Sequence, residues 1–291
     1  MDTAAQLVLL TLAAGTPLVF AALGELVTEK SGVLNLGVEG MMLVGAVIAF
    51  IVAATTKSPW LGVVAGMLAG AALALLFAVV TLTLQANQVA SGLALSLFGV
   101  GLSAFIGLDY VSVVIEPIPP VLGVNPLVLL SLLLFALIQW FLVGTRAGLV
   151  LRAVGESPQS AHAIGYPVVA IRYLAVLFGG ACSGLGGAYL SLVYNPSWTE
   201  GMTAGRGWIA LALVVFATWK PWRVLAGAYL FGGVTLAQFQ AQALGVDIPS
   251  QYLSMLPYVA TVIVLAIISR DAATIKLNAP ASLGRPFHPD A

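Results

Sequence analysis

The sequence predicts an all-α membrane protein, a polytopic transmembrane helix bundle of about nine spans. Of its 291 residues, 60% are hydrophobic and only 8% are charged, and the mean hydropathy is +1.06. A soluble domain carries about 25% charged residues, so this composition excludes an ordinary soluble fold and a disordered chain. Eleven acidic residues balance eleven basic ones. The chain therefore has no net field that would attract nucleic acid.

Nine apolar runs are long enough to cross a bilayer, which takes about 20 residues. Eight or ten spans remain as alternatives, because the ends of the shorter runs are poorly marked. The seventh run is short enough for a half helix or a re-entrant segment. The predicted spans are 4–24, 40–56, 60–84, 88–108, 125–144, 168–194, 206–219, 224–243 and 253–269.

The positions of the basic residues predict the orientation of these spans. With nine spans and a cytoplasmic C-terminus, the N-terminus lies outside, and only Lys57 and Arg206 of the eleven Lys and Arg residues fall on the outer side. Membrane proteins concentrate Lys and Arg on the cytoplasmic side, so the opposite orientation is rejected. The inner basic residues are Lys30, Arg146, Arg152, Arg172, Lys220, Arg223, Arg270, Lys276 and Arg285.

The chain reads as one transmembrane domain, residues 1–270, followed by a short cytoplasmic tail, residues 271–291. The tail contains Pro and Ala and is expected to be poorly ordered. Small residues at helical spacing let helices approach closely in lipid. Two sets of glycines predict such packing: Gly62, Gly66 and Gly70, and the run 179–187.

Side chains that carry chemistry are scarce inside the predicted spans. Charges within the membrane mark proton relays and ion pathways, so their near absence argues against an ion-driven pump or antiporter. A membrane enzyme needs acid, base or nucleophilic groups, and the chain is therefore not expected to be an enzyme. Cys182, His162 and His288 have no partners at metal-ligand spacing, so no metal site is expected.

The inner segment 146–167, RAGLVLRAVGESPQSAHAIGYP, is the longest internal stretch that does not look membrane-embedded. Ser157 is a good N-cap, and Pro158 suits the first turn of a helix. Gly165 is a natural residue to follow a helix end. These signals predict a two-turn helix at about 158–164 on the cytoplasmic face. Such a helix is either a contact for a cytoplasmic partner or part of a simple connector.

Three glycines interrupt the apolar pattern in the segment 32–40, GVLNLGVEG. Non-helical backbone at membrane depth is tolerated where it is buried in protein or lines a cavity. One interpretation is a broken helix beside a translocation path, with Asn35 in the break and Glu39 complementing the positive end of a helix that starts near Gly40. The other is a glycine-rich cytoplasmic turn with Glu39 as a solvated cap. The stretch Gly201–Trp208 also opens a short apolar run and forms a weak internal repeat with this segment.

Neutral polar side chains gather at two further places. Asn87, Gln88 and Ser91 lie between the third and fourth spans at spacings that allow one helix face, and Gln238 and Gln242 share a face of the eighth span. Amides and hydroxyls of this kind suit a pathway for an uncharged polar solute. They equally suit hydrogen bonds between helices or a contact between subunits.

The outer loop 195–200, NPSWTE, lies where an external solute-delivering protein would dock. Asn195 and Trp198 are the candidate contacts for such a protein. Trp198 also suits an aromatic belt at the membrane surface, and this second interpretation is favoured.

Four stretches of the sequence together resemble a family of ABC importer permeases. They read GVLNLGVEGMMLVGA, ANQVASGLAL, RAVGESPQSAHAIGY and GRGWIALALVVFATWKP. The family is that of branched-chain amino acid, ribose and simple-sugar permeases. Within it, the chain is most similar to the shorter permease of nucleoside or simple-sugar importers served by basic-membrane-protein-type lipoproteins. The resemblance extends over nearly the whole chain.

The resemblance implies a heteromeric complex in the inner membrane of a bacterial cell. A cytoplasmic ATPase would bind ATP and Mg, a second homologous permease or another copy of this chain would complete the pathway, and an extracytoplasmic lipoprotein would deliver the solute. The chain itself would hold no cofactor. The resemblance also assigns the inner segment to coupling with the ATPase, through Arg152, Gly155, Glu156, Ser157, Pro158, Ala161 and Gly165.

The function implied is ATP-driven import of a neutral polar solute by alternating access. The nearly charge-free spans fit a nucleoside or a simple sugar better than an amino acid, whose two charges would need compensation. Asn35, Glu39, Asn87, Gln88, Ser91, Gln238 and Gln242 are the candidate pathway residues. The alternative function is an ATP-independent channel or facilitator for small neutral solutes, for which the inner helix would only be a connector.

Overall fold

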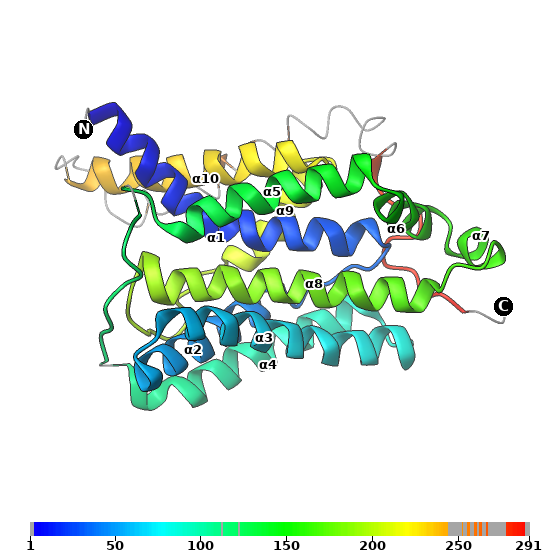
Figure 1. Cartoon of the computed structure of the whole chain (residues 1–291), viewed down its shortest axis with the longest axis horizontal. Coiled ribbons are helices and arrows are strands. Elements are labelled where there is room, and N and C mark those ends of the chain that lie inside the picture. Colours follow the sequence, from blue (N-terminus) through cyan, green and yellow to red (C-terminus); the bar gives the residue numbers. More distant parts are fainter. Residues whose placement is uncertain are drawn as a thin grey trace.

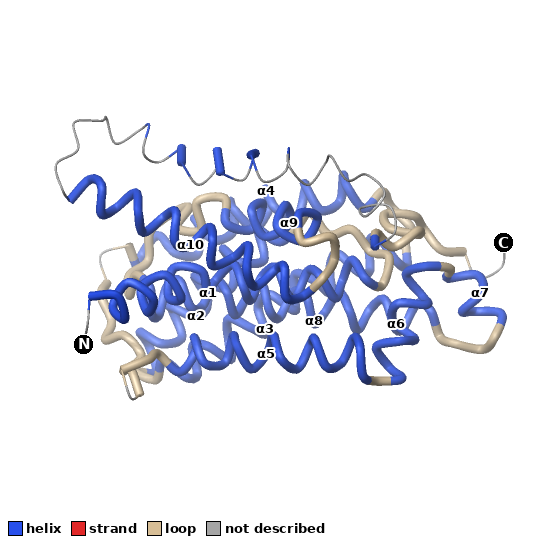
Figure 2. The backbone as a smooth tube through the Cα atoms, turned by 90° about the horizontal axis from the view of Figure 1, so that it is seen from above, coloured by secondary structure: helices blue, strands red, loops and turns tan. Residues whose placement is uncertain are grey.

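The computed structural model describes residues 3–111, 113–121, 123–243 and 278–288, with the isolated positions 252, 255–256, 259–260, 262–263 and 266. This described part is a helical bundle that contains no β-strand, and its long helices run along one common axis (Figures 1 and 2). The helices are α1 (Thr3–Lys30), α2 (Val38–Thr56), α3 (Pro59–Ala78), α4 (Gln88–Gly107), α5 (Pro126–Gly144), α6 (Arg146–Glu156), α7 (Pro158–Ala163), α8 (Val168–Tyr189), α9 (Arg206–Phe216) and α10 (Pro221–Ala243).

Seven of the described helices are long and apolar enough to cross a membrane: α1, α2, α3, α4, α5, α8 and α10. They correspond to seven of the nine predicted spans. The seventh predicted span, 206–219, is α9, whose eleven residues rise only about 16 Å. It is therefore the half helix that the sequence allowed. The ninth predicted span, 253–269, falls on residues that are described only at isolated positions.

Helix α1 continues past its predicted end at residue 24 and carries two buried carboxylates. Glu25 and Glu29 are 0% and 1% exposed, and α1 ends only at Lys30. The expectation of span interiors nearly free of ionisable groups is therefore wrong for this helix. Buried carboxylates are costly unless they are hydrogen-bonded. Glu25 accepts from the Asn35 N–H, and Glu29 accepts from the indole of Trp219, 190 residues later in the chain.

Helices α1, α2, α3 and α8 form the closely packed centre of the bundle (Figure 1). Glycines bring the backbones of α3 and α8 into direct contact. A Cβ added at Gly70 would overlap the carbonyl oxygen of Gly180, and one at Gly184 would overlap that of Gly66. This contact confirms the predicted role of the glycines at helical spacing, which is close helix packing.

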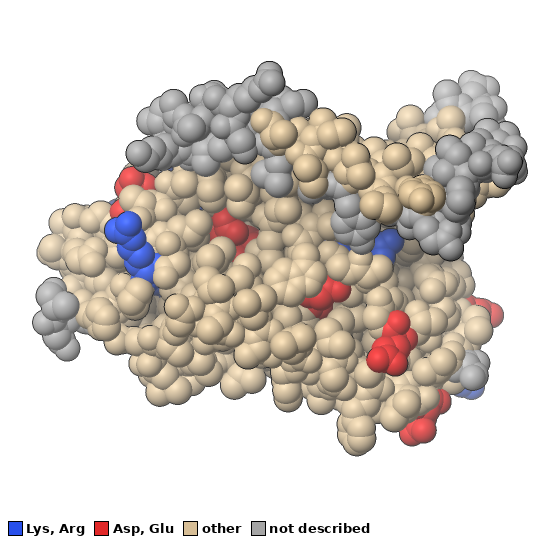
Figure 3. All heavy atoms as spheres, turned by 180° about the vertical axis from the view of Figure 1, so that it is seen from behind, with Lys and Arg blue, Asp and Glu red and all other residues tan. Residues whose placement is uncertain are grey.

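Helices α4, α5 and α10 expose large apolar side chains. Leu97 and Phe105 of α4 are 74% and 75% exposed, and Trp140 of α5 is 64% exposed. One wide face of the molecule is formed mostly by uncharged residues (Figure 3). Surfaces of this kind suit contact with lipid chains or with another membrane subunit.

The first turns of α1 lie at one end of the bundle, and α6, α7 and residues 278–288 lie at the other (Figure 1). Termini at opposite ends agree with an odd number of crossings. The assignment of the α6–α7 end to the cytoplasm stays a prediction from the charge pattern. We call it the inner end.

The described part of the tail, residues 278–288, is packed against the inner end. Ser282 and Phe287 are both 6% exposed, and Phe287 joins an apolar cluster with Val154, Ala161 and Val168. The expectation that the tail is poorly ordered is wrong for these residues. Its composition gave no sign of the docking, because the partners lie more than 100 residues earlier in the chain.

Candidate functional site

The chain between α1 and α2 turns back into the bundle as non-helical backbone. Residues 33–36 have no regular structure, and Val33, Asn35 and the start of α2 are buried. A Cβ added at Gly40 would contact Leu95 and Ser96, near the middle of α4. Helix α2 therefore begins about halfway along α4, inside the bundle. The interpretation of segment 32–40 as a solvated turn is therefore wrong, since the segment is buried non-helical backbone; its place beside a translocation path stays a prediction.

Side chains from α1 and α4 hold this break by hydrogen bonds to its backbone. The Gln88 Oε1 atom accepts from the Leu34 N–H at 2.8 Å, and the Ser96 hydroxyl donates to the Leu36 carbonyl at 2.8 Å. Glu25 Oε1 accepts from the Asn35 N–H at 3.2 Å. Irregular backbone is thus satisfied within the protein, as it must be away from water.

Glu39 joins the start of α2 to the start of α9. Its carboxylate accepts from the Thr203 hydroxyl at 2.6 Å, the Gly205 N–H at 3.0 Å and the Gly207 N–H at 2.6 Å. Glu39 is 6% exposed. The free N–H groups and the dipole at a helix N-terminus favour an anion. The two glycine-rich segments that form the weak sequence repeat therefore meet in space, and we call this meeting point the central junction.

The glycines of the second segment make the close approach possible. Gly205 has φ 78°, a conformation that favours glycine. A Cβ added at Gly207 would lie 2.5 Å from Glu39 Cα. A larger residue at position 207 would push α9 away from Glu39. Glu39 thus fixes the N-terminus of the short helix α9 inside the bundle. Short helices that begin inside a membrane bundle occur near the solute sites of transporters.

The inner end of α1 is tied to the end of α9 through Glu29. Its Oε2 atom accepts from the Trp219 indole N–H at 2.5 Å. Thr218 and Trp219 have φ of 49° and 53°, so the connection from α9 to α10 turns sharply there. Sequence reasoning missed Glu25 and Glu29, because the predicted span ended at residue 24.

The candidate pathway residues fall into two groups. Asn35 and Gln88 lie along the break before α2 and Glu39 lies in the first turn of α2, whereas Gln238 and Gln242 lie on the outer half of α10, away from the first turn of α4 (Figure 1). Gln238 is buried and Gln242 is exposed. Asn87 is exposed and caps α4 by accepting from the Ala90 N–H at 2.9 Å, and Ser91 is partly buried in the next turn. Among the described residues, Gln88 Nε2 is a buried donor without a partner.

Helix α7 has the boundaries that the capping signals predicted. Ser157 Oγ accepts from the Ser160 N–H at 3.3 Å. At the other end Gly165 has φ 93°, and the Tyr166 N–H donates to the Ala161 carbonyl at 3.0 Å. This is the hydrogen-bond pattern of a glycine C-cap. The predicted helix at 158–164 is confirmed as Pro158–Ala163.

The predicted coupling residues divide between two sides of the inner end. Gly155, Pro158 and Ala161 are buried against the bundle, and a Cβ added at Gly155 would overlap the Lys30 carbonyl. Arg152, Glu156 and Gly165 are exposed, and Ser157 caps α7 between them. Sequence reasoning missed further exposed residues at this tip, of which Ile164 is 73% exposed. The other missed residues are Gln159, Ser160 and His162.

The outer loop places its two candidate residues differently. Asn195 is exposed, as are Thr199 and Glu200. Trp198 is 0% exposed and packs among Leu43, Ala46, Val47 and Phe50 of α2. The expectation that Trp198 belongs to an aromatic belt is therefore wrong, and its ring has no surface for a docking protein. A loop tryptophan with an apolar pocket beneath it gains more from burial than from the interface.

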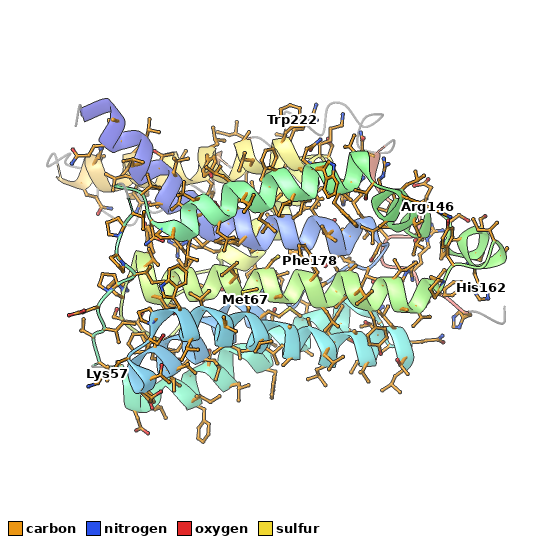
Figure 4. The ribbon with its side chains drawn as sticks, in the orientation of Figure 1. Lys57, Met67, Arg146, His162, Phe178 and Trp222 are labelled. Atoms are coloured by element: carbon orange, nitrogen blue, oxygen red, sulfur yellow. The ribbon has the colours of Figure 1, made fainter. Side chains whose placement is uncertain are left out.

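An apolar groove of about 810 Å³ opens between α5 and α8 at the inner end. Val27 of α1 and Phe141 of α5 line it, Phe178 lies in the space between α8 and α1, and Arg146 stands at one end of it (Figure 4). Its lining is almost entirely apolar, so it does not suit a polar solute. The sequence gave no separate signal for this groove.

The comparisons with known proteins identify the family. A family model described as "Branched-chain amino acid transport system / permease component" matches residues 7–265. The chain belongs to this family. It is accordingly a multi-pass protein of the cell membrane, and the resemblance found in the four sequence stretches is confirmed.

Curated relatives of this permease carry names that mention sugars and nucleosides. The "Putative glucose ABC transporter permease protein TsgC13" of Haloferax volcanii is 41% identical, with 97% of each chain covered. The nucleoside ABC transporter permease protein NupC of Lactococcus lactis subsp. cremoris is 34% identical over 90% of this chain and 92% of its own. The guanosine ABC transporter permease protein NupQ of Bacillus subtilis is 33% identical over 88% and 89%. The search of solved structures found no match.

Proposed function

We propose that this permease is the membrane subunit of an ABC importer and that it carries a neutral polar solute, a nucleoside or a simple sugar. The observation that carries the proposal is the exposed, well-capped helix α7 at the inner end of a chain that belongs to a transporter permease family. The names of its relatives support the two solute classes. ATP and Mg would be held by a separate cytoplasmic ATPase.

A continuous set of contacts leads from α7 to the central junction. The corner before α7 packs through Gly155 on the Lys30 carbonyl at the end of α1. The preceding residue of α1, Glu29, holds Trp219 just after the end of α9, and about one turn earlier Glu25 holds the break before α2. Both α2 and α9 then meet at Glu39. A displacement of α7 by the ATPase would therefore shift the start of α2 and the start of α9 together. Alternating access requires such a joint movement of the helices beside the pathway.

The polar groups at the central junction and along the break before α2 suit an uncharged solute. The Glu39 carboxylate is already engaged by a hydroxyl and two backbone N–H groups, so it offers no free charge to an ionic ligand. The buried Gln88 Nε2 donor has no partner within the described residues, and an unpaired buried donor is costly unless a ligand binds it. Gln88 is thus the first residue to test as a solute contact, with Asn35 beside it.

The assembly around the chain is a part of the same proposal. The apolar rim of α4 and α10 would meet a second homologous permease or another copy of this chain. The outer loop would receive an extracytoplasmic binding lipoprotein through Asn195, with Thr199 and Glu200 replacing the buried Trp198 as neighbouring contacts. The surface of α7 with Arg152 and Glu156 would meet the ATPase.

Mild-detergent purification of the tagged chain from its native membrane tests the proposal first. An ATPase with a phosphate-binding loop and a second permease are expected to co-purify, and the reconstituted complex is expected to take up labelled guanosine or glucose only with ATP. Uptake of a charged solute, and of no nucleoside or sugar, would contradict the proposed solute class. A homo-oligomer that passes solute without any ATPase would favour the channel.

Removal of residues 158–164 separates an importer from a channel. An importer is expected to lose uptake while the chain still elutes as a folded species, whereas a channel is expected to keep its uptake.

The milder variant Ile164→Asp places a charge on the exposed tip of α7 and is expected to weaken ATPase binding by about tenfold, since interface hot spots contribute 1–2 kcal/mol or more. Val114→Asp is the matched control, because Val114 is an equally exposed apolar residue (77%) at the other end of the molecule.

A further inference from the structure

We infer that residues 278–288, here called the docked tail, are a working part of the coupling end, and that they fix α7 to the end of α1 so that displacement of α7 reaches the bundle. This inference rests on the proposed function and adds an element that none of the sequence signals assigned. It is carried by four groups of contacts. They join the docked tail to the corner between α6 and α7, to the start of α8, to α7 and the connection after α3, and to the end of α1 with the turn after it.

The first group joins the docked tail to the corner between α6 and α7. The Gly155 carbonyl accepts from both the Ser282 N–H, at 3.0 Å, and the Ser282 hydroxyl, at 2.6 Å. A carbonyl in the last turn of a helix lacks an intrahelical donor, and the docked tail supplies two. The other face of Gly155 lies on the Lys30 carbonyl. Gly155 is therefore held between the docked tail and the end of α1.

The second group is centred on Arg172, near the start of α8. Its guanidinium donates to the Ser31 carbonyl at 3.1 Å, the Ser282 hydroxyl at 3.0 Å and the Arg285 carbonyl at 3.3 Å. Arg172 is 1% exposed. A buried charge needs several good hydrogen bonds to offset its desolvation. Here two of the three acceptors belong to the docked tail and the third to the turn after α1.

The third group places the end of the docked tail beneath α7. The Phe287 ring packs with Val154, Ala161 and Val168 and lies edge-on to the His162 ring at 5.6 Å between centroids. Its carbonyl accepts from Gln85 Nε2 at 3.3 Å, which reaches the connection between α3 and α4.

The docked tail also pairs with the glycine-rich break. The Gly284 N–H donates to the Gly32 carbonyl at 3.1 Å, and the Lys30 ammonium donates to the Asn278 carbonyl at 2.9 Å. One short segment thus bonds to the end of α1, the turn after it, the α6–α7 corner and the start of α8. The α6–α7 corner, the end of α1 and the turn after it belong to the route from α7 to the central junction, and the start of α8 is held beside them by Arg172.

The physical need for such a segment follows from the size of α7. A helix of six residues cannot hold its own position, because its stability comes from packing rather than propensity. Ser157 and Gly165 on either side of it are not helical, so α7 can tilt at these two residues. Without Phe287 beneath it, α7 would tilt when the ATPase moves. With the docked tail in place, the same movement is passed to α1.

The test compares Phe287→Ala with His288→Ala in the complete reconstituted complex. His288 is the exposed neighbour of Phe287 and is the matched control. Phe287→Ala is expected to leave ATPase binding and solute-stimulated ATP hydrolysis within about twofold, but to lower the number of solute molecules imported per ATP by about fivefold or more, the size of an ordinary coupling factor. His288→Ala is expected to keep the wild-type ratio. A merely structural role would not change this ratio.

A second variant, Ser282→Ala, removes one bond to Gly155 and one to Arg172 without opening a cavity, and it is expected to lower the same ratio. An unchanged import-to-hydrolysis ratio in both variants would overturn the inference. So would an equal fall of import and hydrolysis, which would show that the docked tail only supports assembly. If the wild-type chain binds no ATPase at all, the proposed function fails before either variant is measured, and the two failures are thereby distinguished.

Discussion

Glu39 is the residue on which the geometry of the central junction depends. It is a nearly buried carboxylate with three donors, all from the segment 203–207. Hydrogen bonds to charged groups contribute about 1.5–3 kcal/mol each. The residue predicted as a helix-end or pathway group therefore fixes one broken helix to another.

The variant Glu39→Gln tests this role. It keeps the shape but replaces one accepting oxygen by an NH₂ group that faces backbone donors, so we expect a loss of about 2–3 kcal/mol and a fall in melting temperature of about 5–10 °C. Thermal unfolding of the purified chain in detergent measures it. Glu200→Gln, on the exposed outer loop, is the control. Equal melting temperatures for the two variants would show that the junction does not depend on the charge.

At the scale of single helices, glycine decides how closely α3 and α8 approach. Gly70→Ala would place a methyl group against the α8 backbone, and overpacking of this kind costs about 1–3 kcal/mol. Gly101→Ala, inside α4, is a matched control, because nothing lies within 4 Å of its added Cβ. We expect Gly70→Ala to lower the melting temperature and Gly101→Ala to leave it unchanged or raise it slightly, since alanine favours a helix. Equal melting temperatures for the two variants would show that α3 and α8 pack less closely than the structure shows.

Short elements with local signals were the easiest to predict from the sequence. Helix α7 was found to within one residue because Ser157, Pro158 and Gly165 all act on their own neighbours. The half-length α9 was found from the length of its apolar run. What determines the end of α1 is not local. Asn35 and Trp219 donate to Glu25 and Glu29 and so help to offset their burial within the helix, and no short window of sequence contains both Glu29 and Trp219.

Long-range packing also explains the remaining differences. The break at 32–40 was only one of two interpretations, and its partner segment at 201–207 was seen as a weak repeat, since pairing across 164 residues leaves no pattern in a single sequence. Trp198 looked like an interfacial residue because its loop is polar, while the pocket that buries it is built by α2. The docked tail was missed for the same reason.

For the whole molecule, the structure separates a rigid centre from a less packed rim. Helices α1, α2, α3 and α8 are joined through glycine contacts and buried side chains, whereas α4, α5 and α10 expose much of their apolar surface. Close-packed interfaces switch between arrangements rather than deform. We therefore expect the centre to move as one body, with the start of α9 attached to it through Glu39, and the pathway to open where the rim helices meet the partner permease.

The bond between Glu39 and the start of α9 also has an electrical consequence. Moving one elementary charge across the whole membrane changes its energy by about 2.3 kcal/mol per 100 mV. The carboxylate and the positive end of α9 are tied together and shift as one unit, so their opposite charges partly cancel in any rearrangement. Import of a neutral solute into proteoliposomes is expected to change by less than about twofold when a potential of 100 mV is imposed. Cells that lose their membrane potential but keep their ATP would then continue to import the solute through this permease.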